Sequence, residues 1–179
     1  MDENLALGSF LGSLVNELQS TLGKPTLNAL IYRIGQKSAE IIAKRILEKH
    51  KQNGGNFENI SAAFNLFQSM VSQLFEAELL NQNNEEDRTV IKIKNRCPFH
   101  KLIAEREDLE YGGTLCQFTK AYFEQSLKKL TDIKVEYKLN GVKPTEDYCY
   151  VELVFLKDLK EMEKEMEAKL KETNSQSIN

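Results

Sequence analysis

One stretch of the chain decides the fold: residues 112–155, GGTLCQFTKAYFEQSLKKLTDIKVEYKLNGVKPTEDYCYVELVF. Its first half repeats apolar residues every three or four positions, which predicts an amphipathic helix that Thr114 caps after the two glycines. Its second half alternates apolar and polar residues over 133–139 and again over 149–155, which predicts two half-buried strands. The connection at 140–147 is short enough for these strands to pair antiparallel. The stretch therefore predicts a helix packed on an antiparallel sheet.

Three further helical patterns precede this stretch. Apolar residues at helical spacing occupy 3–22, about 25–50 and about 59–80. Pro25 suits the first turn of the second helix, where its missing N–H leaves no hydrogen bond unmade. Gly35, inside the second helix, indicates a close contact with another helix.

Between the third helix and the deciding stretch, the hydrophobic period changes from that of a helix to that of a strand. Over 88–97, apolar and charged residues alternate, with Cys97 in phase with the apolar face. A short helical turn is expected after Pro98. The fold class predicted is α+β, with N-terminal helices packed on a small antiparallel sheet.

Charged residues dominate the end of the chain. Acidic and basic residues alternate over 157–172, often as opposite charges four positions apart, which predicts an exposed helix with a narrow apolar stripe. That stripe is expected to dock on the domain or on a second subunit. We divide the chain into an N-terminal helix (1–25), one domain (26–156), and a charged C-terminal helix with a frayed tail (157–179).

Composition excludes several classes of protein. With 179 residues and 41% hydrophobic positions, the chain suits one globular domain. No apolar run approaches the roughly 18 residues that a transmembrane helix needs, and the acidic start is unlike a secretory signal, so we expect a cytoplasmic protein without a transmembrane segment. A net charge of -3 provides no general attraction to phosphate backbones, so we expect no nucleic-acid partner.

Four residues form the constellation most capable of chemistry. Strand alternation places Cys97 and Cys149 on the inner face of one sheet, and the intervening helix brings Cys116 beneath it. His100 follows Cys97 by three residues, a separation that allows both to bind one metal ion. Since zinc accepts sulfur and nitrogen ligands in a tetrahedron, Cys97, His100, Cys116 and Cys149 are the candidate ligands of a zinc site.

Two other interpretations of the cysteines remain open. Free cysteines often fill core gaps, and no CxxC pair is present. Alternatively, Cys116 in the first turn of its helix gains a lowered pKa from the helix dipole and acts as a nucleophile with His100 as base. The chain contains no phosphate-binding glycine loop, HExxH or GxSxG motif, so we expect a binding protein rather than an enzyme.

The order of elements resembles a known family. Three helices and a strand, followed by GGTLCQFTKAYFEQSL, KVEYKLNG and EDYCYVELVF, resemble the 4-vinyl reductase domain, a small ligand-binding module that shares its fold with core subunits of the TRAPP vesicle-tethering complex. The resemblance covers about 26–156 and is most specific at Gly141 and Cys149. It implies an α+β domain, usually dimeric, with an apolar cavity between the helices and the sheet.

The resemblance also implies a ligand set. Some relatives hold zinc through Cys and Glu, and Cys116, Glu136 and Cys149 match three of these ligands by position. Leu139 stands where a further Cys is expected, and strand alternation points Glu136 away from the Cys149 face. Cys97 and His100 would then supply the substitute ligands.

Three functions follow. The leading hypothesis is a module that binds or senses an apolar or aromatic small molecule, acting as a homodimer. The residues expected to line its pocket are Phe64, Phe67, Tyr122, Phe123 and Tyr137. In the alternative interpretation, these aromatic residues only pack the core. The second is a TRAPP-like interaction or scaffold subunit with a protein partner. The third is a cysteine-dependent hydrolase similar to the aminothiazoline-carboxylate hydrolases, a likeness based on the Cys97-Pro98 pair and the two later cysteines.

Overall fold

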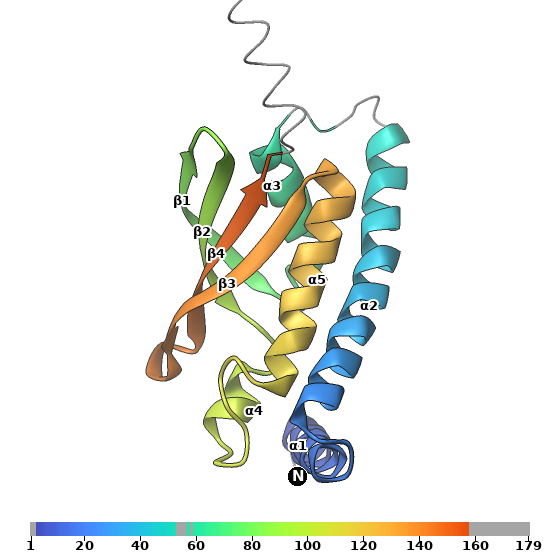
Figure 1. Cartoon of the computed structure of the whole chain (residues 1–179), viewed down its shortest axis with the longest axis vertical. Coiled ribbons are helices and arrows are strands. Elements are labelled where there is room, and N and C mark those ends of the chain that lie inside the picture. The colour runs from blue at the N-terminus through green and yellow to red at the C-terminus, as the bar shows by residue number, and fades with distance from the viewer. Residues whose placement is uncertain (1–2, 53–56, 58, 158–179) are drawn as a thin grey trace, which may run out of the picture.

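Helices and one antiparallel sheet make up the part of the chain that the structure, a computed structural model, describes: residues 3–52, 57 and 59–157 (Figure 1). The elements are α1 (Glu3–Leu22), α2 (Lys24–Gln52), α3 (Ile60–Val71), β1 (Glu76–Asn84), β2 (Arg88–Arg96), α4 (His100–Ala104), α5 (Thr114–Thr131), β3 (Lys134–Lys143), the 3-10 turn η1 (Pro144–Glu146) and β4 (Tyr148–Leu156). The predicted α+β class is confirmed. Within these residues no helix is both long and apolar enough to cross a membrane.

The sheet has the strand order β1-β2-β4-β3, and every neighbouring pair is antiparallel. The predicted pairing of the last two strands is confirmed, with Tyr137 opposite Leu153. Helices α3 and α5 cover one face of the sheet, and α2 packs on the outer side of α5 (Figure 1). The main apolar core therefore lies between the sheet and the α3–α5 layer.

The contact between α2 and α5 depends on a glycine. A Cβ atom at Gly35 would lie 2.7 Å from the Phe118 carbonyl oxygen and 2.9 Å from the Ala121 Cβ. Any side chain at this position would push the two helices apart, which confirms the predicted close contact.

The predicted helix over 59–80 is wrong in its second half. Helix α3 ends at Val71, and the chain then forms β1. β1 is an edge strand whose side chains are mostly exposed, so it shows no alternating pattern that would reveal it in the sequence. Its pairing with β2, interrupted by a bulge between Leu79 and Asn81, overrides the helical spacing of the apolar residues.

The predicted N-cap of α5 is also wrong. Gly113 is the N-cap, and Thr114 is the first helical residue. The Thr114 hydroxyl instead donates a hydrogen bond to Asn28 on α2, with an Oγ–Oδ1 distance of 2.7 Å, so it joins two helices. The predicted C-terminal helix lies outside the described residues beyond 157, and the division into 1–25, 26–156 and 157–179 stays a prediction.

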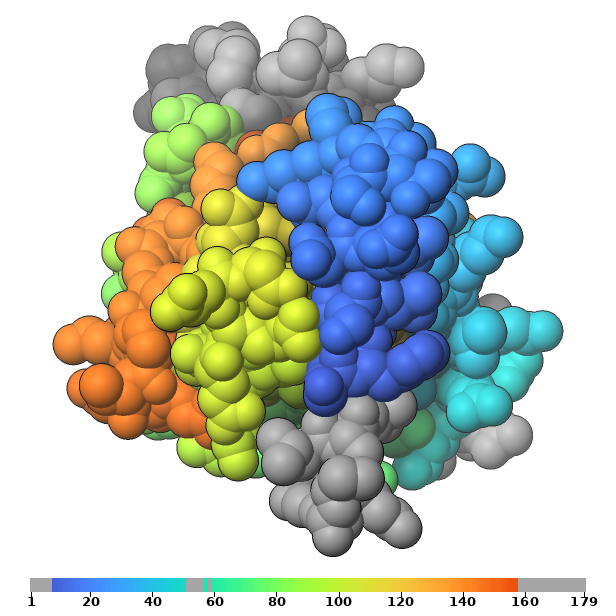
Figure 2. Space-filling model, turned by 90° about the horizontal axis from the view of Figure 1, so that it is seen from below, coloured from blue at the N-terminus to red at the C-terminus, as the bar shows by residue number. Residues whose placement is uncertain are grey.

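A second, smaller core lies under α1. It contains Val15, Leu27, Ile103 and Leu115, which come from α1, α2, α4 and α5. Figure 2 shows α1 lying against the segment that carries α4 at this end of the molecule. The residues of α4 are thereby held between α1 and the end of the sheet.

Candidate functional site

Polar side chains are buried at the end of the sheet that α4 covers. Asn95, near the end of β2, and His100, which begins α4, are each 1% exposed, and Thr119 on α5 is 2% exposed. Three of their atoms, Asn95 Oδ1, His100 Nε2 and Thr119 Oγ, have no hydrogen-bond partner among the described residues. We call these three residues the polar cluster. Unpaired polar atoms are rare in protein cores, so the cluster requires an explanation.

His100 is held by its neighbours. Its Nδ1 lies 3.5 Å from Cys149 Sγ, and its backbone oxygen accepts a hydrogen bond of 3.2 Å from the Tyr111 hydroxyl. Burial lowers the pKa of His100, nearby Arg96 lowers it further, and Asp147 opposes this effect. His100 is therefore neutral at pH 7.

The three thiols act on one another. Burial raises the pKa of Cys149 to about 12, and the neighbouring Cys97 and Cys116 raise it as well. Burial also raises the pKa of Cys97, whereas the Phe99 backbone and the Thr119 side chain lower it in part. All three thiols are therefore protonated near neutral pH.

The expected low pKa of Cys116 is wrong. Burial raises the pKa of this thiol to about 11. The Gly112 N–H donates to Cys116 Sγ at 3.3 Å and lowers the pKa, but burial in an apolar surrounding has the larger effect. The expected base, His100, contacts Cys149 instead. The structure thus gives no support to a Cys116 nucleophile.

The zinc site stays a prediction. Nowhere among residues 3–52, 57 and 59–157 do three His, Cys, Asp or Glu side chains form a group that could hold a metal ion. Glu136 lies on the outer face of the sheet, where its carboxylate pairs with Lys134 at 3.0 Å and with Lys138 at 3.7 Å. This agrees with the alternation that points it away from Cys149.

The aromatic residues predicted to line a pocket lie together in the main core. Phe64, Phe67 and Phe123 are completely buried. The Phe123 ring packs edge-on against Phe67 at 5.1 Å and Tyr137 at 5.8 Å, and Tyr122 lies 6.2 Å from Phe67, all between ring centroids. Their close packing agrees with the alternative in which these rings fill the core.

Phe75 belongs to the same aromatic cluster and was missed. Its ring centroid lies 5.1 Å from that of Tyr122 and 5.4 Å from that of Phe123. The residue immediately precedes β1, in the region assigned to a helix.

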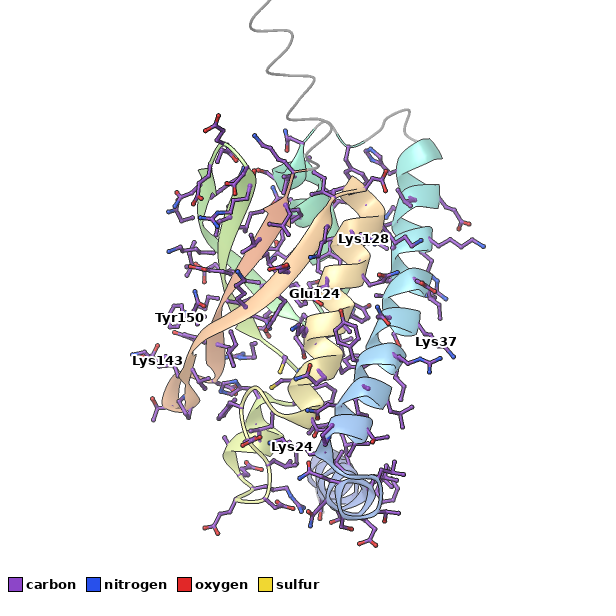
Figure 3. All side chains as sticks on the ribbon, viewed as in Figure 1. Lys24, Lys37, Glu124, Lys128, Lys143 and Tyr150 are labelled. Carbon is purple, nitrogen blue, oxygen red and sulfur yellow. The ribbon has the colours of Figure 1, made fainter. Side chains whose placement is uncertain are left out.

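Tyr137 connects the aromatic cluster with the polar cluster. Burial raises its pKa well above the usual value, the three thiols raise it further, and the Asn95 side chain lowers it. Its backbone N–H donates to Glu124 at 2.8 Å, and the other oxygen of that carboxylate accepts from the Tyr32 hydroxyl at 2.5 Å. Glu124, labelled in Figure 3 between α5 and β3, thus links α2, α5 and β3.

Hollows on the described surface lie elsewhere. One of about 470 Å³ opens between α2 and α5, with Ala43, Leu47 and Lys129 in its lining. Another of about 250 Å³ lies beside β1. None of the five predicted pocket residues lines either hollow.

Asn95 and Thr119 were not among the predicted site residues. A signal for Asn95 exists in the sequence, because it follows Ile91 and Ile93 in the inward phase of the strand. A polar residue at a core position of an alternating strand indicates either a structural network or a binding site. Thr119 carries the same signal, because it lies four residues after Leu115 and four before Phe123 on the apolar face of the amphipathic helix.

Comparison with solved structures identifies the class of fold. The phenol-responsive sensory domain of the transcription activator PoxR, solved with phenol, has a TM-score of 0.61 at 15% identity and covers 89% of this chain and 79% of its own. Trafficking protein particle complex subunit 3 from Naegleria fowleri, covalently bound to palmitic acid, has a TM-score of 0.52 at 14% identity and covers 87% and 95%. The chain thus shares its fold with a ligand-sensing domain and a TRAPP subunit, as the resemblance implied.

Comparisons of sequence add less. No family model matches the chain. It is 29% identical over 156 residues to ribosomal lysine N-methyltransferase 4 of Saccharomyces cerevisiae, an alignment that covers 76% of this chain. The chain spans only 31% of the length of that enzyme, so we do not attribute the enzyme's activity to this chain.

Proposed function

We propose that this domain binds a small, uncharged, largely apolar molecule that carries a hydroxyl group, and places that hydroxyl in the polar cluster. The observation that carries the proposal is the set of three unpaired polar atoms on Asn95, His100 and Thr119, each in a side chain at least 98% buried. Leaving such groups without partners costs about 1–3 kcal/mol each. A ligand that pairs with them removes this cost.

The protonation of His100 determines what it can bind. Burial raises the pKa of Cys149 to about 12, so its thiol keeps its proton, and we assign that proton to the contact with His100 Nδ1, which lies 3.5 Å from the sulfur. A neutral imidazole that accepts at Nδ1 carries its proton on Nε2. The unpaired Nε2 is thus a donor, whereas the unpaired Asn95 Oδ1 is an acceptor.

A hydroxyl group meets both requirements, because its oxygen accepts and its proton donates. A carboxylate or phosphate would lack a proton for Asn95, and the surrounding protonated thiols and neutral imidazole offer it no compensating charge. The apolar part of the ligand would lie against Tyr137 and the adjoining aromatic cluster, whose rings provide apolar surface.

Calorimetric titration tests the proposal with three probes: phenol, 1-decanol and benzene. We expect phenol or 1-decanol to bind. Benzene should bind at the same site as phenol but more weakly, because benzene has no hydroxyl group to pair with the polar atoms. Asn95→Leu should reduce the preference for phenol over benzene by roughly tenfold, the equivalent of one hydrogen bond of about 1.4 kcal/mol. Failure of all three probes to bind, or equal binding of phenol and benzene, would contradict the proposal.

A role as an interaction subunit is the second candidate, because α1 and α2 expose large apolar side chains such as Phe10, which is 64% exposed. A hydrolase is not proposed, since burial keeps the expected nucleophile, Cys116, protonated.

A further inference from the structure

The hollow between α2 and α5 has an apolar floor and a charged rim. Ala43, which is buried, and Leu47, which is half-buried, lie four residues apart on α2 and form the floor. Exposed charged side chains surround them, among them Lys44 and, from α5, Lys129. The volume is about 470 Å³, and we call this feature the α2–α5 hollow. Apolar side chains at the bottom of an open hollow indicate a place where another segment packs.

The charge around the α2–α5 hollow is mainly positive. α2 contains seven Lys or Arg residues and two glutamates. Among the described residues, Lys129 has no ion-pair partner, and Lys44 has only Glu48, at 3.9 Å. A segment that fits the hollow should therefore combine apolar side chains with an excess of acidic ones.

Residues 161–170 of this chain, which lie outside the described residues, have this composition. Their sequence, EMEKEMEAKL, contains four glutamates and two lysines. Met162, Met166 and Leu170 recur every four residues, the spacing that also separates Ala43 from Leu47. In a helix, this spacing places the three apolar side chains on one side. We call these ten residues the acidic segment.

The end of the described chain lies close to the hollow. β4 ends at Leu156, which pairs with Lys134, and Lys134 follows the last turn of α5, which carries Lys129. Figure 1 shows the ends of β4, α5 and α2 at the same end of the molecule. The backbone from Lys157 to Met162 spans up to about 17 Å, which exceeds the distance of about 8–10 Å between packed helices. The acidic segment is therefore within reach of the hollow.

We infer that the acidic segment of this chain folds back as a helix into the α2–α5 hollow, antiparallel to α2. It enters from the C-terminal end of α2, so Met162 packs beside Leu47, and Met166 packs beside Ala43. Its glutamates face the basic side chains of α2 and α5. The inference does not depend on the proposed function, because no residue of the polar cluster lines the hollow.

The same register covers the most exposed large apolar side chain of α2. Ile41 is 59% exposed, and it borders the hollow because it lies three residues before Lys44. Leu170 follows Met166 by one helical turn in the direction of the start of α2, so it packs beside Ile41. Docking thus removes an isolated apolar side chain from water.

Disulfide trapping in the full chain tests the inference. Leu47→Cys combined with Met162→Cys should form a disulfide within one chain when oxidised glutathione is added, and mass spectrometry of the peptides would detect the link. Phe10→Cys combined with Met162→Cys is the control and should not link. Phe10 is 64% exposed, but it lies on α1, at the opposite end of the molecule (Figure 1).

A mixture of isotope-labelled and unlabelled chains identifies which chain supplies the segment. Links between two peptides with the same labelling support the inference. Links between a labelled and an unlabelled peptide would show that a second copy occupies the hollow, and would overturn it. The absence of a link, or a link as frequent as in the control, would overturn it as well.

Hydrogen exchange of the backbone amides provides a test without introduced cysteines. In the unmodified chain, the amides of the acidic segment should exchange at least roughly tenfold more slowly than in Met166→Asp, which places a charge on the docking side. Ala168→Asp is the matched control on the opposite side of the helix and should keep the protection. Rapid exchange in the unmodified chain, or equal loss of protection in the two variants, would contradict the inference.

Discussion

The two ends of the core beneath the sheet differ in what they contain. Under α3 the core holds completely buried rings, such as Phe67 and Phe123, which pack edge to face. Under α4 it holds Asn95 and His100, equally buried but with unpaired polar atoms. Ring packing stabilises the folded state, whereas unpaired polar atoms destabilise it. The end under α3, which we call the aromatic end, thus stabilises the fold, whereas the end under α4, which we call the polar end, is the one that we propose binds a ligand.

The largest expected effect is at the aromatic end. Phe67→Ala should lower the free energy of unfolding by about 4 kcal/mol, since it leaves a cavity among rings that cannot collapse into it. Urea denaturation followed by circular dichroism measures the change. Leu79→Ala, at a site 42% exposed, is the control and should change the free energy by less than about 1 kcal/mol. Equal effects at the two positions would contradict the assigned role of the aromatic end.

The second prediction concerns the reactivity of the Cys116 thiol. Because burial raises the pKa of Cys116 from 9.0 to about 11, its thiolate fraction at pH 7.5 is expected to be roughly a hundredfold lower than that of a free cysteine. Iodoacetamide should therefore modify Cys116 slowly in the folded protein and rapidly in urea, as mass spectrometry of the peptides would show. Rapid modification of the folded protein would restore the nucleophile hypothesis.

Removing a polar atom from the polar end should raise stability. Thr119→Val keeps the shape of the side chain and deletes the unpaired hydroxyl, so the free energy of unfolding should increase by about 1 kcal/mol. Denaturation in urea measures it, with Ser126→Ala as a second buried, unpaired hydroxyl on α5. A loss of stability in Thr119→Val would mean that the hydroxyl already has a partner, namely the Cys97 thiol, whose pKa the Thr119 side chain lowers.

The smallest expected effect is the dependence of stability on pH. Since burial lowers the pKa of His100 in the folded state, the unfolded chain binds more protons below about pH 6.5, and stability should fall as the pH decreases through that value toward the folded-state pKa. Unfolding measured at pH 7.5 and 5.5 should show this loss, and His100→Gln should reduce it. A loss of the same size in the variant would show that other groups cause it.

Much of this fold could be predicted because its hydrophobic periods are regular. The strands at 88–96 and 148–156 alternate clearly, and α2 repeats over its length. β1 escaped because an exposed edge strand buries too few side chains to set a period. The candidate site was harder to predict. The sequence shows that Cys116 lies in the first turn of a helix, but not that burial has a larger effect on its pKa than the helix dipole.

The polar cluster shows the same limit. Its members come from β2, α4 and α5, and only the fold brings them together. Cys149, predicted to face inward, does so, yet its contact with His100 follows from the placement of α4 under the sheet.

NMR of the imidazole nitrogens tests whether His100 presents a donor to a ligand hydroxyl. We expect a neutral ring with its proton on Nε2 at pH 7, and a shift of the Nε2 signal when phenol is added but a smaller one with benzene. A proton on Nδ1, or an Nε2 signal that phenol leaves unchanged, would contradict the claim.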